Sequence, residues 1–173
     1  MKAHNGMRPQ DIVVLLKIIT IGNVDWQYRD LSSTLFLSTS EVSESLYRSH
    51  IAGLVDESKR KVFRQSLMEF IEHGLHYVFP QQPGTMLIGI PTAHSQLLFK
   101  SYFSAELEYV WPDENGWIRG LSIIPLYKGV TKAIKTDDEL YILLAAIDII
   151  RVGRTRELKV ALDILHNKIM NER

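Results

Sequence analysis

Hydrogen-bonding side chains recur in residues 39–48 at a spacing that places them on one side of a helix. Val42 and Leu46 are four residues apart and predict the opposite, buried side of that helix. Hydroxyl, phenol, carboxylate and guanidinium groups can hydrogen bond to base edges or to phosphates, so the polar side could read a nucleic acid. The outward-facing set is Thr39, Ser40, Ser43, Glu44, Tyr47 and Arg48.

A short cationic segment follows this helix. The sequence DESKRKVFR brings together Lys59, Arg60, Lys61 and Arg64. Each of these cations could contact the phosphate backbone beside the helix, with a modest and salt-sensitive contribution to binding. Such a run is also typical of a solvated surface, so its position directly after the helix is what favours nucleic-acid binding.

The elements that must position these side chains are three helices near the N-terminus. A proline at its start and a glycine just past its end predict a first helix over 9–21. Leucines four residues apart predict a second over 27–35. Ser38 and Glu41 form a capping-box pattern at the start of the third helix, which ends at residues 52–53.

The stretch LSTSEVSESLYRSHIAGLV, with Leu31 and Leu35 before it, resembles the winged helix-turn-helix superfamily, and the MarR-like bacterial transcription regulators most closely. It is similar to the family pattern Leu-Ser-x-Ser-x-Val-Ser-x-x-Leu-x-x-Leu-x-x-x-Gly-Leu-Val. The resemblance covers residues 9–64 and implies that the third helix enters the major groove of DNA, with a wing after it.

Two departures from the family pattern affect this interpretation. Ser49 stands where the family usually has an apolar residue, and Ile51 could compensate for it. Only DESKRK separates Val55 from Val62, so we expect a wing that is reduced toward a turn.

Two acidic residues argue against a simple DNA-reading helix. Glu41 belongs to the capping box, where the helix dipole favours a carboxylate. Glu44 has no such local role in the sequence. It could accept a hydrogen bond from the N4 amino group of cytosine, or it could be a solvated residue on a helix that contacts no DNA.

Composition describes an ordinary globular chain. Its 173 residues are 46% hydrophobic and 23% charged, with a formal net charge of zero and no cysteine. The zero net charge argues mildly against a strong nucleic-acid binder, and the absence of cysteine excludes disulfides and thiolate zinc sites. We expect a cytoplasmic protein, because the N-terminus lacks a secretory pattern and the apolar runs are too short to span a membrane.

The remaining two thirds of the chain predict a mixed region and a helical pair. We expect a fourth helix over 66–78, a loop in QQPGTMLIGIPTAHSQ, and a β-hairpin within 98–125 that turns at Asn115-Gly116. Two helices follow in 137–170, the first capped from Thr136, with a break at Gly153. The predicted fold is mainly α (α+β), with a winged helix-turn-helix in 1–64, a linking region in 65–136 and a C-terminal helical pair in 137–173.

Several aromatic residues gather around the predicted hairpin. They are Tyr109, Trp111, Trp117 and Tyr127. They form either a small aromatic core or a platform for a ligand, a protein partner or a single-stranded nucleic acid. A protein partner or a small-molecule effector would bind in the region 80–130, which exceeds what a minimal MarR-like subunit needs.

Nothing in the sequence predicts an enzyme, a cofactor or a metal site. His73 and His76 have a spacing that metal ligands can use, but no carboxylate joins them at a typical spacing. Thr92, His94 and Ser95 are close in sequence without an identifiable acid partner. Glu106 and Glu108 would share one face of a strand, which a solvent-facing edge explains equally well.

Apolar stripes on the last two predicted helices could serve either of two purposes. They would form a dimer interface, or they would pack back on the N-terminal helices. The function that we expect is sequence-specific binding of double-stranded DNA by a dimeric transcription regulator. The alternative is a protein-interaction adaptor or antitoxin-like partner that uses the same fold without binding DNA.

Overall fold

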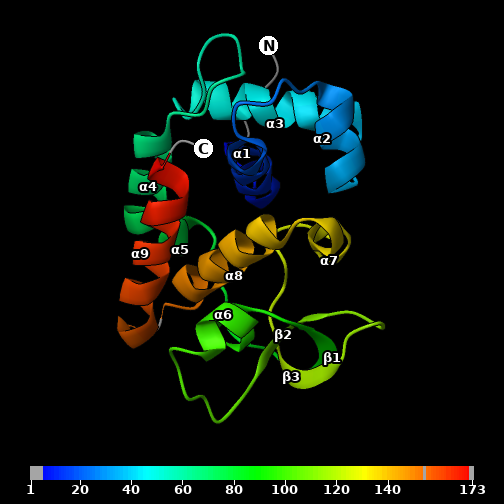
Figure 1. Cartoon of the computed structure of the whole chain (residues 1–173), viewed down its shortest axis with the longest axis vertical. Helices are drawn as coiled ribbons and strands as arrows, with labels where there is room; N and C mark the ends of the chain where they lie inside the picture. The colour runs from blue at the N-terminus through cyan, green and yellow to red at the C-terminus, as the bar shows by residue number, and fades with distance from the viewer. Residues whose placement is uncertain (1–5, 154, 172–173) are drawn as a thin grey trace.

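The computed structural model describes residues 6–153 and 155–171, which form an α+β fold (Figure 1). The elements in chain order are α1 (Pro9–Ile21), α2 (Tyr28–Leu35), α3 (Thr39–Ile51), α4 (Arg64–His73), α5 (Leu75–Val78), β1 (Met86–Pro91), the 3₁₀ helix η1 (Ala93–Ser95), α6 (Leu97–Lys100), β2 (Tyr109–Pro112), β3 (Ile118–Ser122), α7 (Val130–Ala133), the 3₁₀ helix η2 (Ile134–Thr136), α8 (Asp138–Val152) and α9 (Thr155–Met170). Figure 1 shows α1, α2 and α3 at one end, the strands at the other, and α8 between them.

The three N-terminal helices are confirmed, with bounds within one residue of the prediction. Each begins with a carboxylate in its first turn that accepts a hydrogen bond from the backbone N–H before the helix, which satisfies donors that the helix leaves unpaired. For α3 this is the predicted capping box of Ser38 and Glu41. The tight turn before α3 is made by Phe36 in the left-handed region, with a φ of 55°.

A compact loop joins α3 to α4. Val55 and Val62 form one antiparallel β-bridge, and Asp56 organises residues between them. The Asp56 carboxylate accepts hydrogen bonds from the backbone N–H groups of Arg60 and Lys61, both at 2.9 Å. The shortened excursion expected from the sequence is therefore a single bridge with a tight turn.

Helix α8 is the centre of the fold. Ten of its residues are buried, and it packs against α1, α5 and α9. Helix α9 buries Ala161, Leu165 and Ile169 and packs against α4 and α8. The buried residues of this helical pair are thus covered within one chain, where α8 packs on the N-terminal helix α1 and α9 packs on α4 and α8. Gly153 ends α8 in the left-handed region with a φ of 77°.

The strands form a small closed sheet in which β1 is antiparallel to both β2 and β3. The predicted hairpin is wrong, because β2 and β3 pair in parallel and residues 113–117 fold back over β1. Gly89 permits this closure, since a Cβ there would lie 2.1 Å from the carbonyl oxygen of Trp111. The predicted loop in 81–96 is also wrong, because it contains β1 and η1.

A buried polar network joins this sheet to α8. The Asp148 carboxylate accepts hydrogen bonds from the Thr92 hydroxyl at 2.7 Å, the Trp111 indole N–H at 2.6 Å and Arg151 Nη1 at 2.8 Å. Burial raises the pKa of Asp148, and Arg151, Thr92 and Trp111 oppose this shift. Arg151 also donates to the backbone carbonyl of Ile124 at 2.8 Å, so the network fixes the segment that leaves β3.

Two helix starts differ from the prediction. The helix expected over 66–78 is two helices, α4 and α5, which are separated at Gly74, and α4 begins without a side-chain cap. The cap of α8 is Asp137 rather than Thr136, because the Asp137 carboxylate accepts a hydrogen bond from the N–H of Leu140 at 2.9 Å.

Among the helices that residues 6–153 and 155–171 form, none is long and apolar enough to cross a membrane.

Candidate nucleic-acid interface

The outer face of α3 presents five of the six side chains that the sequence placed there. Thr39, Ser40, Ser43, Glu44 and Tyr47 are exposed. Val42 and Leu46 are fully buried on the opposite side, which fixes the rotation of the helix about its axis. The result is a hydroxyl-rich helix face with one phenol and, counting Glu41, two carboxylates.

Arg48 is the exception, and its predicted outward orientation is wrong. The side chain is buried, and its guanidinium makes a two-pronged contact with Asp11 of α1. Nε donates to one carboxylate oxygen at 2.9 Å and Nη2 to the other at 2.6 Å. These hydrogen bonds raise the pKa of Arg48 above its ordinary value. Arg48 therefore holds α3 against α1 and does not reach a base edge.

The two carboxylates of α3 both have local partners. Hydrogen bonds from the backbone N–H and the hydroxyl of Ser38 hold the pKa of Glu41 below its ordinary value. Glu44 lies 3.9 Å from Nη1 of Arg48, on the side that Asp11 leaves open. Glu44 is thus a second, exposed partner of a buried cation, which the sequence did not show. No described residue on the exposed side of α3 carries a positive charge.

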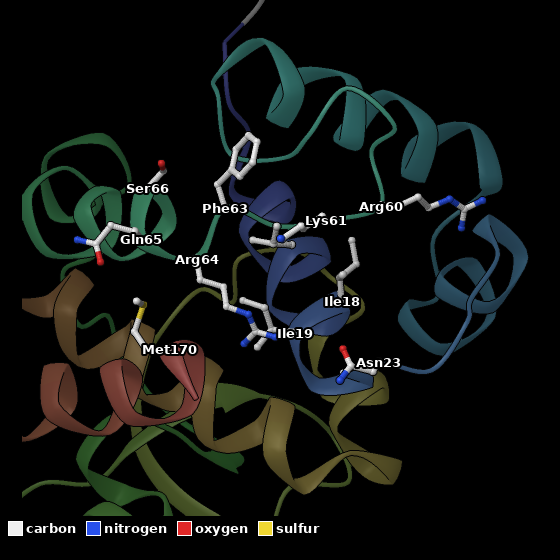
Figure 2. Close-up of a pocket in the computed structure, with 12 residues that line it drawn as sticks. Ile18, Ile19, Asn23, Arg60, Lys61, Phe63, Arg64, Gln65, Ser66 and Met170 are labelled. Carbon is white, nitrogen blue, oxygen red and sulfur yellow. The ribbon is translucent and has the colours of Figure 1, made fainter. Parts of the chain in front are cut away.

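The cations after α3 are divided between several roles. The Arg60 guanidinium stacks on the Trp26 ring, 4.5 Å from its centroid, and donates to the carbonyl of Trp26. Arg64 donates to the carbonyl of Ile169 near the end of α9. Figure 2 shows Arg64 directed into a groove beside α1. Lys61 is exposed, and Lys59 is half-buried with a φ of 59°.

Two further cations lie near the start of α3, and the sequence did not predict that they would lie there. The Lys128 side chain is close enough to Glu41 to lower its pKa. Nζ of Lys132 lies 5.8 Å from the ring centroid of Phe36, in the turn before α3. Both are exposed, and the Tyr127 hydroxyl fixes their segment by donating to the carbonyl of Leu35 at 2.5 Å. No local sequence signal links them to α3, because the contact arises only on folding.

The residues that raised the question of catalysis make contacts within the fold, and Nδ1 of His94 lies 3.7 Å from a carboxylate oxygen of Glu157. Thr92, His94 and Ser95 are all buried: Thr92 donates to Asp148, and Ser95 Oγ accepts from the backbone N–H of Tyr109 at 2.7 Å. Nε2 of His94 lies 2.8 Å from the carbonyl oxygen of Leu107.

The histidine and acidic pairs also have ordinary surroundings. His73 is exposed beside Glu72, and Nδ1 of His76 lies 3.0 Å from the carbonyl oxygen of Arg151. Glu108 pairs with Lys100. The described residues contain no group of three or more histidines, aspartates and glutamates that could hold a metal ion.

The aromatic residues around the sheet form a small core, one of the two possibilities that the sequence left open. Tyr109, Trp111 and Tyr127 are buried, so they offer no stacking platform for a single-stranded nucleic acid. Trp117 is 65% exposed, and its backbone N–H donates to the carbonyl of Gly89 at 3.1 Å. β1, to which this backbone bonds, lies at the end of the molecule away from α3.

Comparisons of the chain with protein-family models, with curated proteins and with solved structures found no match. The functional argument therefore depends on the geometry of the chain itself.

Proposed function

We propose that this protein binds double-stranded DNA through the outer face of α3 and acts as a transcription regulator. In this arrangement α3 lies in the major groove, where Ser43 and Tyr47 contact base edges or phosphates. The winged helix-turn-helix resemblance of residues 9–64 supports the proposal, whereas the short bridge-and-turn that follows α3 favours the adaptor alternative.

The observation that carries the proposal is the distribution of charge around α3. The helix face itself bears hydroxyls and carboxylates, while cations flank both of its ends; Lys61, Lys128 and Lys132 are exposed and Lys59 is half-buried. Lys59 and Lys61 lie after the helix, Lys128 lies near Glu41 in its first turn, and Lys132 lies near Phe36 in the turn before it. A helix in the major groove has a phosphate backbone on each side of it. Cations that flank the helix can therefore contact phosphates even though the helix face itself is not basic.

A homodimer would allow two copies to read two half-sites of an operator. Its interface would exclude the buried stripe of α8 and the residues Ala161, Leu165 and Ile169, because these are already covered within one chain. The interface of the proposed dimer therefore has to use exposed surface.

Fluorescence anisotropy with labelled duplexes from the region upstream of its own gene tests the proposal. We expect binding that weakens as salt rises. Lys59→Gln and Lys132→Gln should each reduce the slope of log affinity against log salt by about one. Lys159→Gln, an exposed cation on α9, is the matched control and should leave the slope unchanged. Absence of binding at both low and physiological salt, by a folded protein, would exclude the DNA-binding function.

The second candidate is a protein-interaction adaptor. It is favoured by the exposed apolar side chains on β1, with Leu87 43% and Ile88 59% exposed, and by the exposed Trp117, whose backbone bonds to β1. If the DNA titration is negative, Ile88→Ser should abolish association with a protein partner while the isolated protein stays folded. If the DNA titration is positive, loss of DNA binding in Ile88→Ser would contradict the separation of the two surfaces.

A further inference from the structure

A groove of about 810 Å³ lies on the side of α1 and α4, and no residue of α3 is among the described residues that line it. The end of α1, the residues after the Val55–Val62 bridge, the first turn of α4 and Met170 of α9 form its walls. This volume is within the range of sites that hold small molecules. Figure 2 shows Arg64 and Asn23 directed into the same space from opposite walls.

The charges of this groove are all positive. Arg60, Lys61 and Arg64 line it, and no aspartate or glutamate is among its described lining residues. None of the three cations forms an ion pair with a described carboxylate. The buried cations Arg48 and Arg151, by contrast, are paired with Asp11 and Asp148.

The cations differ in how free they are to meet a ligand. Arg60 is held on the Trp26 ring. Arg64 uses one of its N–H groups on the carbonyl of Ile169 and has further donors. Lys61 uses only its backbone in the hydrogen bonds with Asp56, so its ammonium group is the one that can move onto a ligand.

Two other features of the groove suit an organic anion. The first turn of α4 lies in its wall and has neither a side-chain cap nor an acidic residue, so its N–H groups add to the positive potential. The lining also includes apolar side chains, the nearly buried Ile18 and Ile19 of α1 and Met170 of α9. One region of the groove therefore suits a phosphate and another suits the body of an organic molecule.

We propose that this groove binds a small organic phosphate, with Lys61 and Arg64 on the phosphate and Ile18, Ile19 and Met170 against the apolar part. The ligand would contact the loop that follows α3 and the end of α9 at once. It would thus act as an effector that ties the N-terminal helices to the C-terminal helix. This small-ligand site does not require that the protein bind DNA, although Lys61 also belongs to the cations that flank α3.

Isothermal titration calorimetry on the full chain without DNA tests the site. The probes are AMP, which joins a phosphate to a flat ring system, pyrophosphate, which offers phosphate alone, and adenosine, which lacks the phosphate, all at equal ionic strength. We expect AMP and pyrophosphate to bind with one site per chain, AMP more tightly, and adenosine not to bind. Lys61→Gln should weaken AMP binding by about tenfold or more, since it removes one charge-assisted contact.

Lys159→Gln is the matched control, because it removes an exposed cation outside the groove and should leave AMP binding unchanged. Circular dichroism of both variants establishes that they are folded. Failure of AMP and pyrophosphate to bind at millimolar concentration overturns the site, as does binding that is equally strong in Lys61→Gln. If Lys61→Gln weakens only DNA binding, the recognised phosphate belongs to the DNA backbone, and the small-ligand site is excluded.

Discussion

The buried pair of Arg48 and Asp11 makes a quantitative prediction, because its environment is well defined. Asp11 is fully buried, and Arg48 contacts both of its carboxylate oxygens at 2.9 and 2.6 Å. Removing one member of such a pair leaves the other charge buried, which costs about 3–5 kcal/mol of unfolding free energy. We therefore expect Arg48→Ala to lower the melting temperature by roughly 6–20 °C for a chain of this size.

The assay is urea denaturation followed by circular dichroism. The matched control is Arg29→Ala, since Arg29 lies 3.9 Å from Asp30 with both side chains mostly exposed. That substitution should lower the free energy of unfolding by less than about 1 kcal/mol. A double variant that replaces both Asp11 and Arg48 with apolar residues should be more stable than the two single losses added together suggest.

An Arg48→Ala protein as stable as Arg29→Ala would refute the assignment of Arg48 to a buried structural contact. It would also restore the alternative in which Arg48 is available to DNA. If the pair is structural, any loss of DNA binding in Arg48→Ala should follow loss of folding and disappear at temperatures where the variant is folded.

Three further predictions concern the core, the sheet and the start of α3. Asp148→Ala should lower the free energy of unfolding by about 3–5 kcal/mol, because it leaves Arg151 buried without its carboxylate. Asp148→Asn should lower it less. Urea denaturation followed by Trp fluorescence measures both variants. Gly89→Ala should lower the free energy of unfolding by about 3 kcal/mol or more, since its Cβ would meet the Trp111 backbone. Gly84→Ala should lower it by about 1 kcal/mol or less, because the Ser122 hydroxyl that its Cβ meets can rotate. Equal losses of stability would contradict the close approach of the strands at Gly89. The pKa of Glu41 is lowered in the folded state, so its contribution to stability is present above the ordinary carboxyl pKa of about 4 and is lost as pH falls through the folded-state pKa. The stability difference between the wild type and Glu41→Gln should therefore shrink below that pH, and a difference that does not change with pH would exclude the capping role.

Helices with strong local signals were predictable from the sequence. The capping box at Ser38, the spacing of Val42 and Leu46, and the break at Gly153 each act within a few residues, so the order along the chain determines them. The buried face of α3, with Val42 and Leu46, was predictable for the same reason.

Features that depend on a partner far along the chain were not predictable. Helical spacing placed Arg48 outside, because nothing local indicates that Asp11 of α1 would meet it. The run MLIGIP is a strand only because two other segments pair with it. Gly89 and Gly120 allow the strand backbones to approach closely, whereas Asn115-Gly116 suggested only a hairpin turn. Lys132 reaches Phe36, in the turn before α3, because the Tyr127 hydroxyl holds its segment on α2.

The central claim is that the outer face of α3 contacts DNA, and a single added charge tests it most directly. Ser43 is exposed in the middle of that face, and Ser104 is exposed in the loop after α6, far from it. In an anisotropy titration with the same duplex, Ser43→Glu should bind at least about tenfold more weakly than the wild type, because it sets a carboxylate against the DNA. Ser104→Glu should bind like the wild type. Equal binding by both variants would contradict the account and place any DNA contact elsewhere on the molecule.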